Sequence, residues 1–122
     1  MTRQVVAIVD DDESVRESLP ALIESFGLEA RPYSSGHAFL DSGQIGDVDC
    51  IILDVAMPGI SGPDLQRELI RLGHDIPVVF ITAHSDNEAL RGALKGRAVA
   101  CLIKPFGETA LLESVRKALA GR

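Results

Sequence analysis

Four short apolar runs and one looser alternation of apolar and polar residues recur along the chain. Runs of about four to eight apolar residues bounded by turn residues are typical of strands buried on both faces of a sheet. Pro32 lies in the looser segment and cannot donate a hydrogen bond to a neighbouring strand, which favours an edge position. We therefore expect five strands, at residues 5–9, 28–33, 48–53, 76–82 and 99–103.

The stretches that follow these segments carry apolar residues at the three- and four-residue spacing of one helix face. The first helix can be capped by Asp12 or Glu13, and the second by Ser34 or Ser35. Pro20 lies inside the first helix and removes one backbone hydrogen bond, so we expect a kink or a shortened helix. The third helix is expected from Pro63, the fourth over residues 89–95 after a capping box at residues 85–88, and the last around residues 111–119.

Strands that alternate with helices through short connections predict an α/β fold with one parallel sheet, because parallel neighbours need crossovers. Right-handed crossovers place helices on both faces of that sheet. A chain of 122 residues is long enough to bury a core without disulfides or metals. We expect one domain over residues 1–122, with no second domain visible.

The composition narrows the class of protein. A net charge of −6 argues against general binding to nucleic acid or to an anionic membrane. No apolar stretch approaches the roughly 20 residues that cross a bilayer, and the first residues do not resemble a signal peptide. Cys50 and Cys101 lie inside apolar runs, which predicts two reduced, buried thiols. Together these features indicate a cytoplasmic protein.

Polar side chains gather where the predicted strands end: Asp10 and Asp11 after the first, Asp54 after the third, Thr82 on the fourth and Lys104 after the fifth. The carboxyl ends of parallel strands meet at one edge, where ligands bind in such folds. Each pair of carboxylates at about 4 Å costs roughly 4 kcal/mol at an effective dielectric of 20. One lysine cannot offset that repulsion. Mg²⁺, which binds carboxylates, water and phosphate, could.

A divalent cation beside a lysine and a hydroxyl group suits phosphoryl transfer, which depends on positioning and charge stabilisation. Aspartate can act as the nucleophile and form an aspartyl phosphate. Asp54 is the best candidate nucleophile, because it stands alone where its strand ends and is expected to be exposed in the following loop. Asp10 and Asp11 fit better as metal ligands. Pro58, Gly59 and Gly62 make that loop tight, and both glycines are free to adopt a positive φ.

Four motifs in this order resemble the receiver domain of two-component response regulators, over essentially the whole chain. They are residues 9–13 (Val-Asp-Asp-Asp-Glu), residues 53–62 (Leu-Asp-Val-Ala-Met-Pro-Gly-Ile-Ser-Gly), residues 81–83 (Ile-Thr-Ala) and residues 103–106 (Ile-Lys-Pro-Phe). The motif spacing and the Asp-Asp-Asp-Glu-Ser-Val-Arg start resemble most closely the nitrogen-fixation type of regulator, which carries a helix-turn-helix output domain. The resemblance implies a flavodoxin-like (βα)5 fold with strand order 2-1-3-4-5.

The resemblance also implies roles for individual residues. Asp54 would accept a phosphoryl group from a sensor histidine kinase or a phosphotransfer protein, and Thr82 and Lys104 would contact that group. Asp10, Asp11, Asp54 and the backbone carbonyl of Ala56 would hold Mg²⁺. The Lys104–Pro105 peptide bond would be cis.

In that family the domain is a phosphoacceptor switch, not a turnover enzyme, limited to self-phosphorylation and slow self-dephosphorylation. Its output face comprises the fourth helix, the fifth strand and the fifth helix, and phosphorylation can drive homodimerisation. The resemblance implies no direct contact of this domain with nucleic acid or membrane.

Two departures keep alternatives open. Cys101 stands where the family usually has an aromatic residue that swings inward. One alternative is therefore that signalling uses backbone and loop shifts alone. Another is a pseudo-receiver that only binds partners. Ala56 stands where Mg²⁺-dependent phosphohydrolases with an aspartyl phosphate carry their general acid, and those enzymes usually need a cap domain. A single-domain phosphorelay module is a further alternative.

Overall fold

The structure is a computed structural model, and it describes residues 3–83 and 98–120. Strands and helices alternate along the chain as the apolar pattern predicts. The elements are β1 (Val5–Val9), α1 (Glu13–Ser25), β2 (Glu29–Tyr33), α2 (Gly36–Leu40), the 3₁₀ turn η1 (Ile45–Asp47), β3 (Cys50–Asp54), α3 (Gly62–Arg71), β4 (Val78–Thr82), β5 (Ala98–Ile103) and α5 (Glu108–Ala120). The expected fourth helix with its capping box, and His84 before it, lie outside the described residues.

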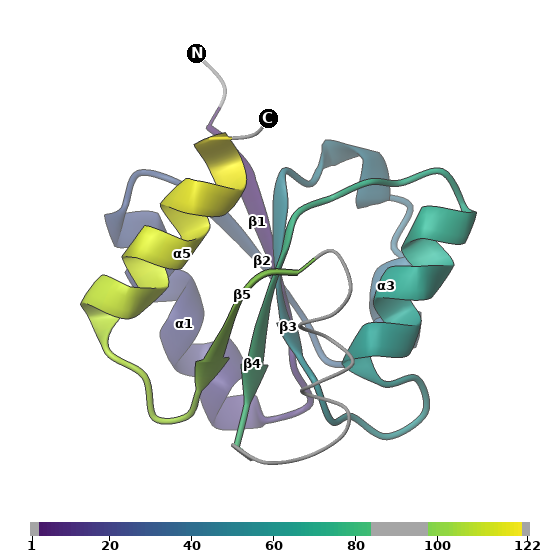
Figure 1. The fold of residues 1–122 in the computed structure, drawn as a ribbon, viewed down its shortest axis with the longest axis horizontal. Helices are drawn as coiled ribbons and strands as arrows, with labels where there is room; N and C mark the ends of the chain where they lie inside the picture. Colours follow the sequence, from purple (N-terminus) through teal and green to yellow (C-terminus); the bar gives the residue numbers. More distant parts are fainter. Residues whose placement is uncertain (1–2, 84–97, 121–122) are drawn as a thin grey trace.

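The five strands form one parallel sheet in the order β2-β1-β3-β4-β5 (Figure 1). This confirms the α/β fold and the strand order that the sequence indicates. The chain first moves outward from β1 to β2 and then returns to place β3 on the other side of β1. At such a reversal the two crossovers leave the sheet on opposite faces, which opens a crevice at the carboxyl ends of the strands.

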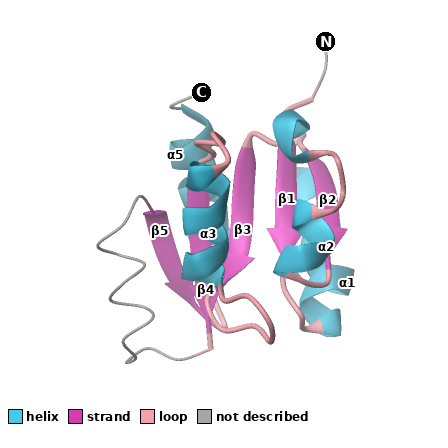
Figure 2. Cartoon of the chain, turned by 90° about the vertical axis from the view of Figure 1, so that its right-hand side faces the viewer, coloured by secondary structure: helices cyan, strands magenta, loops and turns pink. Residues whose placement is uncertain are grey.

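Helices cover both faces of the sheet, with α1 and α5 on one side and α2 and α3 on the other (Figures 1 and 2). The strand period of two explains how one apolar run serves both layers. In β1, Val6 and Ile8 pack with the α1 and α5 side chains, whereas Val5, Ala7 and Val9 pack with those of α2 and α3. Each face of the sheet therefore contributes to its own hydrophobic core.

The two edge strands are less covered than the central three, whose residues are all buried. Cys50 lies in the central strand β3 and is buried, but Cys101 lies in the edge strand β5 and is only half-buried. The prediction of two buried thiols is thus right for Cys50 and wrong for Cys101. An apolar run alone does not tell an edge strand from a central one.

Polar side chains cap the helices of the described chain that flank the carboxyl edge of the sheet. The Asp12 carboxylate accepts from the Ser14 amide at 3.0 Å, and the Ser35 hydroxyl accepts from the Ala38 amide at 3.0 Å. Of the two caps considered for each helix, Asp12 and Ser35 are therefore the ones used.

Pro20 does not shorten the first helix, which runs on to Ser25. Leu19 and Ile23, on either side of Pro20, are both buried against the sheet. Burial of such side chains is worth about 1.5–3 kcal/mol each, which offsets the hydrogen bond that proline removes. Among the described helices, none is both long enough and apolar enough to cross a membrane.

Replacing Ile23 by alanine should lower the free energy of unfolding by about 2–5 kcal/mol, because its fully buried side chain would leave a cavity between α1 and the sheet. Ile70→Ala makes the same chemical change at an exposed position of α3 and should cost less than about 1 kcal/mol. Urea unfolding followed by circular dichroism measures both. Equal losses would show that the α1 face is not part of the core.

Candidate functional site

The residues singled out at the strand ends meet at one edge of the sheet. Asp10 directly follows β1, Asp54 and Thr82 are the last residues of β3 and β4, and Lys104 directly follows β5. Because all five strands are parallel, these positions share the carboxyl edge. The structure thus places the expected residues of these strands at the same edge of the sheet.

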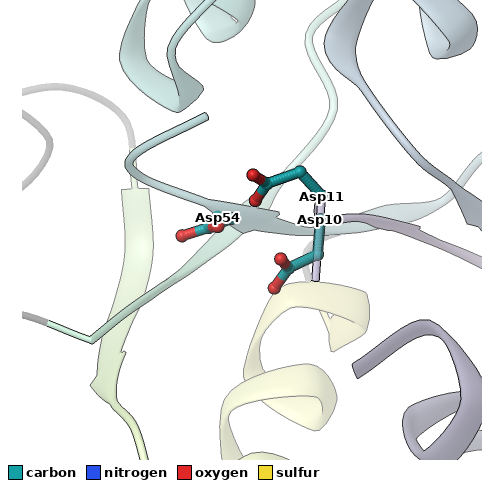
Figure 3. Close-up of side chains that lie close together, drawn as sticks. All are labelled: Asp10, Asp11 and Asp54. Carbon is teal, nitrogen blue, oxygen red and sulfur yellow. The ribbon is translucent and has the colours of Figure 1, made fainter. Parts of the chain in front are cut away.

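Three carboxylates from two segments converge at this edge. Oxygen atoms of Asp10, Asp11 and Asp54 lie within 4.8 Å of one another, and Figure 3 shows the carboxyl groups directed to the same side. Asp10 and Asp54 are buried, while Asp11 is exposed. Two of the three negative charges are therefore held away from bulk water.

Asp54 was expected to be exposed in the loop after β3, but the structure shows that it is only 6% exposed. It pairs with Ile81 in the register of β3 and β4, and the next amide, that of Val55, donates to the Ile81 carbonyl at 2.9 Å. The ladder between the two central strands therefore extends past Asp54. Asp54 is the last paired residue of β3 and lies at the carboxyl edge of the sheet.

Lys104 supplies the positive charge of the site. Its Nζ lies 3.0 Å from Oδ2 of Asp10 and 4.0 Å from Oδ2 of Asp54. The other oxygen of Asp10, Oδ1, accepts from the Asp12 amide at 2.9 Å. The Asp10 carboxylate is thus bonded at both oxygens, whereas Asp54 has a distant ammonium group and a long contact of 3.4 Å from the Ala56 amide to its Oδ1.

The ionisation of the site reflects this unequal sharing. Burial, and then the negative charge of Asp10, raise the pKa of Asp54 to about 7, and Lys104 offsets only part of that rise. Burial lowers the pKa of Lys104, but its hydrogen bond to Asp10 and the charges of Asp54, Asp10 and Asp12 outweigh burial and raise it. The lysine is therefore protonated at neutral pH, and the site keeps an excess of negative charge.

The donor set fits a hard divalent cation. All three side chains offer carboxylate oxygens close enough to share one ion, and no nitrogen or sulfur ligand competes among them. A charge of +2 would offset the negative charge that Lys104 alone leaves uncompensated, and it would favour the ionised form of Asp54. The residues present are thus compatible with Mg²⁺ on both charge and ligand type.

The loop after Asp54 has a fixed path close to the site. Gly59 has φ +81°, which confirms the positive φ expected there, but Gly62 begins α3 and does not adopt one. Gly62 is required for space instead, since a Cβ atom would overlap the backbone carbonyl oxygen of Asp54. Its amide also donates to the Val55 carbonyl at 2.9 Å, so the loop closes directly on the end of β3.

Thr82 and Lys104 are joined through the backbone. The Lys104 amide donates to the Thr82 carbonyl at 2.7 Å, and Thr82 is fully buried. The peptide bond that follows Lys104 is cis, as expected. The ends of β4 and β5 therefore form one unit beside Asp54.

Two contacts at the site were not foreseen. A guanidinium nitrogen of Arg16 donates to the backbone carbonyl of Asp10 at 2.9 Å, and the Asp10 amide donates to the Tyr33 carbonyl at 3.2 Å. Arg16 follows the capping Asp12 by one helical turn, but that spacing also describes an ordinary exposed helix residue. The one signal for Arg16 is that it ends the Asp-Asp-Asp-Glu-Ser-Val-Arg stretch on which the family resemblance rests, and that stretch does not indicate the contact.

The sequence profile of the response regulator receiver domain matches residues 6–116. The chain is 47% identical over 116 residues to the response regulator protein TmoT of Ectopseudomonas mendocina, covering 94% of this chain and 52% of that protein. It is 44% identical over 114 residues to the transcriptional regulatory protein FixJ of Azorhizobium caulinodans, covering 93% and 54%. The chain spans about half the length of the curated relatives it matches.

Solved structures agree with these sequence matches. The crystal structure of FixJ-N superposes with a TM-score of 0.88 at 35% identity, covering 100% of this chain and 98% of that one. The Vibrio cholerae chemotaxis protein CheY4 superposes with a TM-score of 0.84 at 25% identity, covering 97% and 100%. These matches are consistent with the nitrogen-fixation-like type that the motifs resemble. The chain belongs to the response regulator receiver domain family.

Proposed function

We propose that this domain accepts a phosphoryl group on Asp54 from a phosphohistidine of a sensor histidine kinase or phosphotransfer protein. The observation that carries the proposal is the convergence of Asp10, Asp11 and Asp54 within 4.8 Å, with Lys104 between Asp10 and Asp54. The domain acts in the cytoplasm, where its two free thiols stay reduced. In relatives named as transcriptional regulators the output is transcription, and we propose the same output here.

The transfer balances as a substitution at phosphorus. A carboxylate oxygen of Asp54 forms the new O–P bond, the N–P bond of the donor breaks, and the imidazole keeps the electron pair and takes up a proton. The Lys104 ammonium group, 4.0 Å from Asp54, faces the charge that spreads over the phosphoryl oxygens. Thr82 ends β4 beside it and supplies a hydroxyl group for the product.

Asp10, Asp11 and Asp54, with the Ala56 backbone carbonyl, would hold Mg²⁺. When bound, the ion neutralises carboxylate charge and binds phosphoryl oxygens. Asp10 is already oriented by Lys104 and by the Asp12 amide, so it can accept the ion without rearranging. Ala56 offers only backbone groups, and no side chain there can act as a general acid. This favours a stable phosphoacceptor over a phosphohydrolase.

The proposed output face consists of the fourth helix, β5 and α5, and it responds to phosphorylation by forming a homodimer or contacting an output domain. Of these elements, β5 and α5 lie in the described part of the chain. β5 is a half-buried edge strand, and it ends at Lys104. A change in the lysine contact would thereby reach a strand that, in the described part of the chain, pairs with β4 alone.

Incubation with Mg²⁺ and acetyl phosphate should add the mass of one phosphoryl group, and Asp54→Asn should abolish this addition because the nucleophile is lost. Asp64→Asn is the matched control, because Asp64 is exposed in the first turn of α3 and should leave the addition unchanged. Intact-protein mass spectrometry measures all three proteins. Phosphorylation that survives Asp54→Asn would overturn the assignment of the nucleophile.

The free energy of unfolding without divalent cations should fall as pH rises from about 4 through 7. The pKa of Asp54 is about 7 in the folded protein against an ordinary 3.8, so the folded state retains a proton that the unfolded state has lost. Asp54→Asn should flatten this profile and be the more stable protein at neutral pH, as measured by urea titrations across the range. Mg²⁺ should restore wild-type stability at neutral pH, and a wild type that gains stability across this window would contradict the raised pKa.

A further inference from the structure

We propose that Arg16 is a positioning residue that holds the Asp10–Asp11 peptide group and thereby aims the Asp11 carboxylate at the cation site. The inference rests on the proposed function, because it concerns the same carboxylates. Its starting point is the hydrogen bond of 2.9 Å from the Arg16 guanidinium group to the Asp10 backbone carbonyl.

The three carboxylates are oriented by different means. Asp10 is bonded at both carboxylate oxygens, to Lys104 and to the Asp12 amide, and Asp54 is fixed by its place at the end of β3. Asp11 is exposed, and within residues 3–83 and 98–120 no hydrogen bond or ion pair holds its carboxylate. The backbone of Asp11 therefore sets the point from which its side chain can reach the site.

That backbone is set by the peptide group between Asp10 and Asp11. The amide of Asp10 is fixed by the Tyr33 carbonyl, and the amide of Asp12 is fixed by the Asp10 carboxylate. Between these two amides lies the carbonyl of Asp10, which is beyond the end of β1. The hydrogen bond from Arg16 holds this carbonyl in place. Rotation of this peptide group would change the direction in which the Asp11 side chain leaves the backbone, so the bond from Arg16 restrains the position of Asp11.

Arg16 is not simply a counter-ion for the site. In the part of the chain that the structure describes it forms no ion pair, and the cation within reach of Asp10 and Asp54 is Lys104. The bond of Arg16 is to a backbone oxygen, and α1 presents the side chain from one turn beyond its cap, Asp12. The two roles predict opposite changes in Mg²⁺ affinity when Arg16 is replaced. Loss of a positive charge near the site would strengthen cation binding, whereas loss of the correct position of Asp11 would weaken it.

Mg²⁺ affinity, measured from the amide shifts of the unphosphorylated protein, separates these roles. Arg16→Gln should bind Mg²⁺ about tenfold or more weakly, within the range for partners that orient metal ligands. Arg16→Lys, which keeps the charge and reaches part of the way to the carbonyl, should recover part of the loss. Arg116→Gln removes the same charge from an exposed position of α5, beside Gln4 and Leu28 at the opposite edge of the sheet, and should bind as the wild type does.

Each other outcome is decisive. Equal or tighter binding by Arg16→Gln would overturn the positioning role, and so would a variant that no longer folds, since Arg16 would then be a stability residue. Wild-type protein that binds no Mg²⁺ at millimolar concentration would instead refute the proposed function. Thermal unfolding of the cation-free proteins, where Arg16→Gln should match the Arg116→Gln control within a few degrees, checks that the fold is intact.

Discussion

Repulsion among three carboxylates is the interaction on which the rest of this structure depends. Asp10, Asp11 and Asp54 are held within 4.8 Å of one another, and Asp10 and Asp54 are buried. Lys104 lies against Asp10 at 3.0 Å and reaches Asp54 only at 4.0 Å, so one lysine serves two buried acids unequally. Burial, and then the negative charge of Asp10, raise the pKa of Asp54 to about 7, a rise that Lys104 offsets only in part. A folded protein has little reason to keep such an arrangement unless a cation or a phosphoryl group uses it.

The fold prevents the charged groups from moving apart. Three backbone hydrogen bonds extend the sheet beyond its strands: from Asp10 to Tyr33, from Val55 to Ile81 and from Lys104 to Thr82. Each joins a charged site segment to a neighbouring strand, and the strands β1, β3 and β4 are buried along their whole length. Gly62 adds a close approach to the carbonyl of Asp54 that no other residue could make. The charged groups are thus held close together by the three buried strands of the sheet.

The sequence predicts the strands, their order of appearance and the polar residues at the strand ends, because each depends on local patterns of apolar runs and turn residues. It does not predict how deeply each residue lies. Asp54 was expected in an exposed loop, yet the ladder to β4 covers it, and Cys101 was expected in the core, yet β5 is an edge. These depths depend on which strands are neighbours. The Arg16 contact was missed for a related reason, since a bond to a backbone carbonyl leaves no trace in residue type.

The same electrostatics indicate how a phosphoryl group on Asp54 would be sensed. Lys104 already bonds Asp10, and its ammonium group has three N–H donors, so new phosphoryl oxygens on Asp54 would share those donors with that carboxylate. The backbone of Lys104 is tied to the sheet, because its amide is bonded to the Thr82 carbonyl and the residue directly follows β5. β5 is half-buried and has a neighbour strand on one side only, whereas Cys101 within it is too small to act as a swinging aromatic group. Under the proposed function, we therefore expect the joined ends of β4 and β5 to be the segment that responds to a phosphoryl group on Asp54.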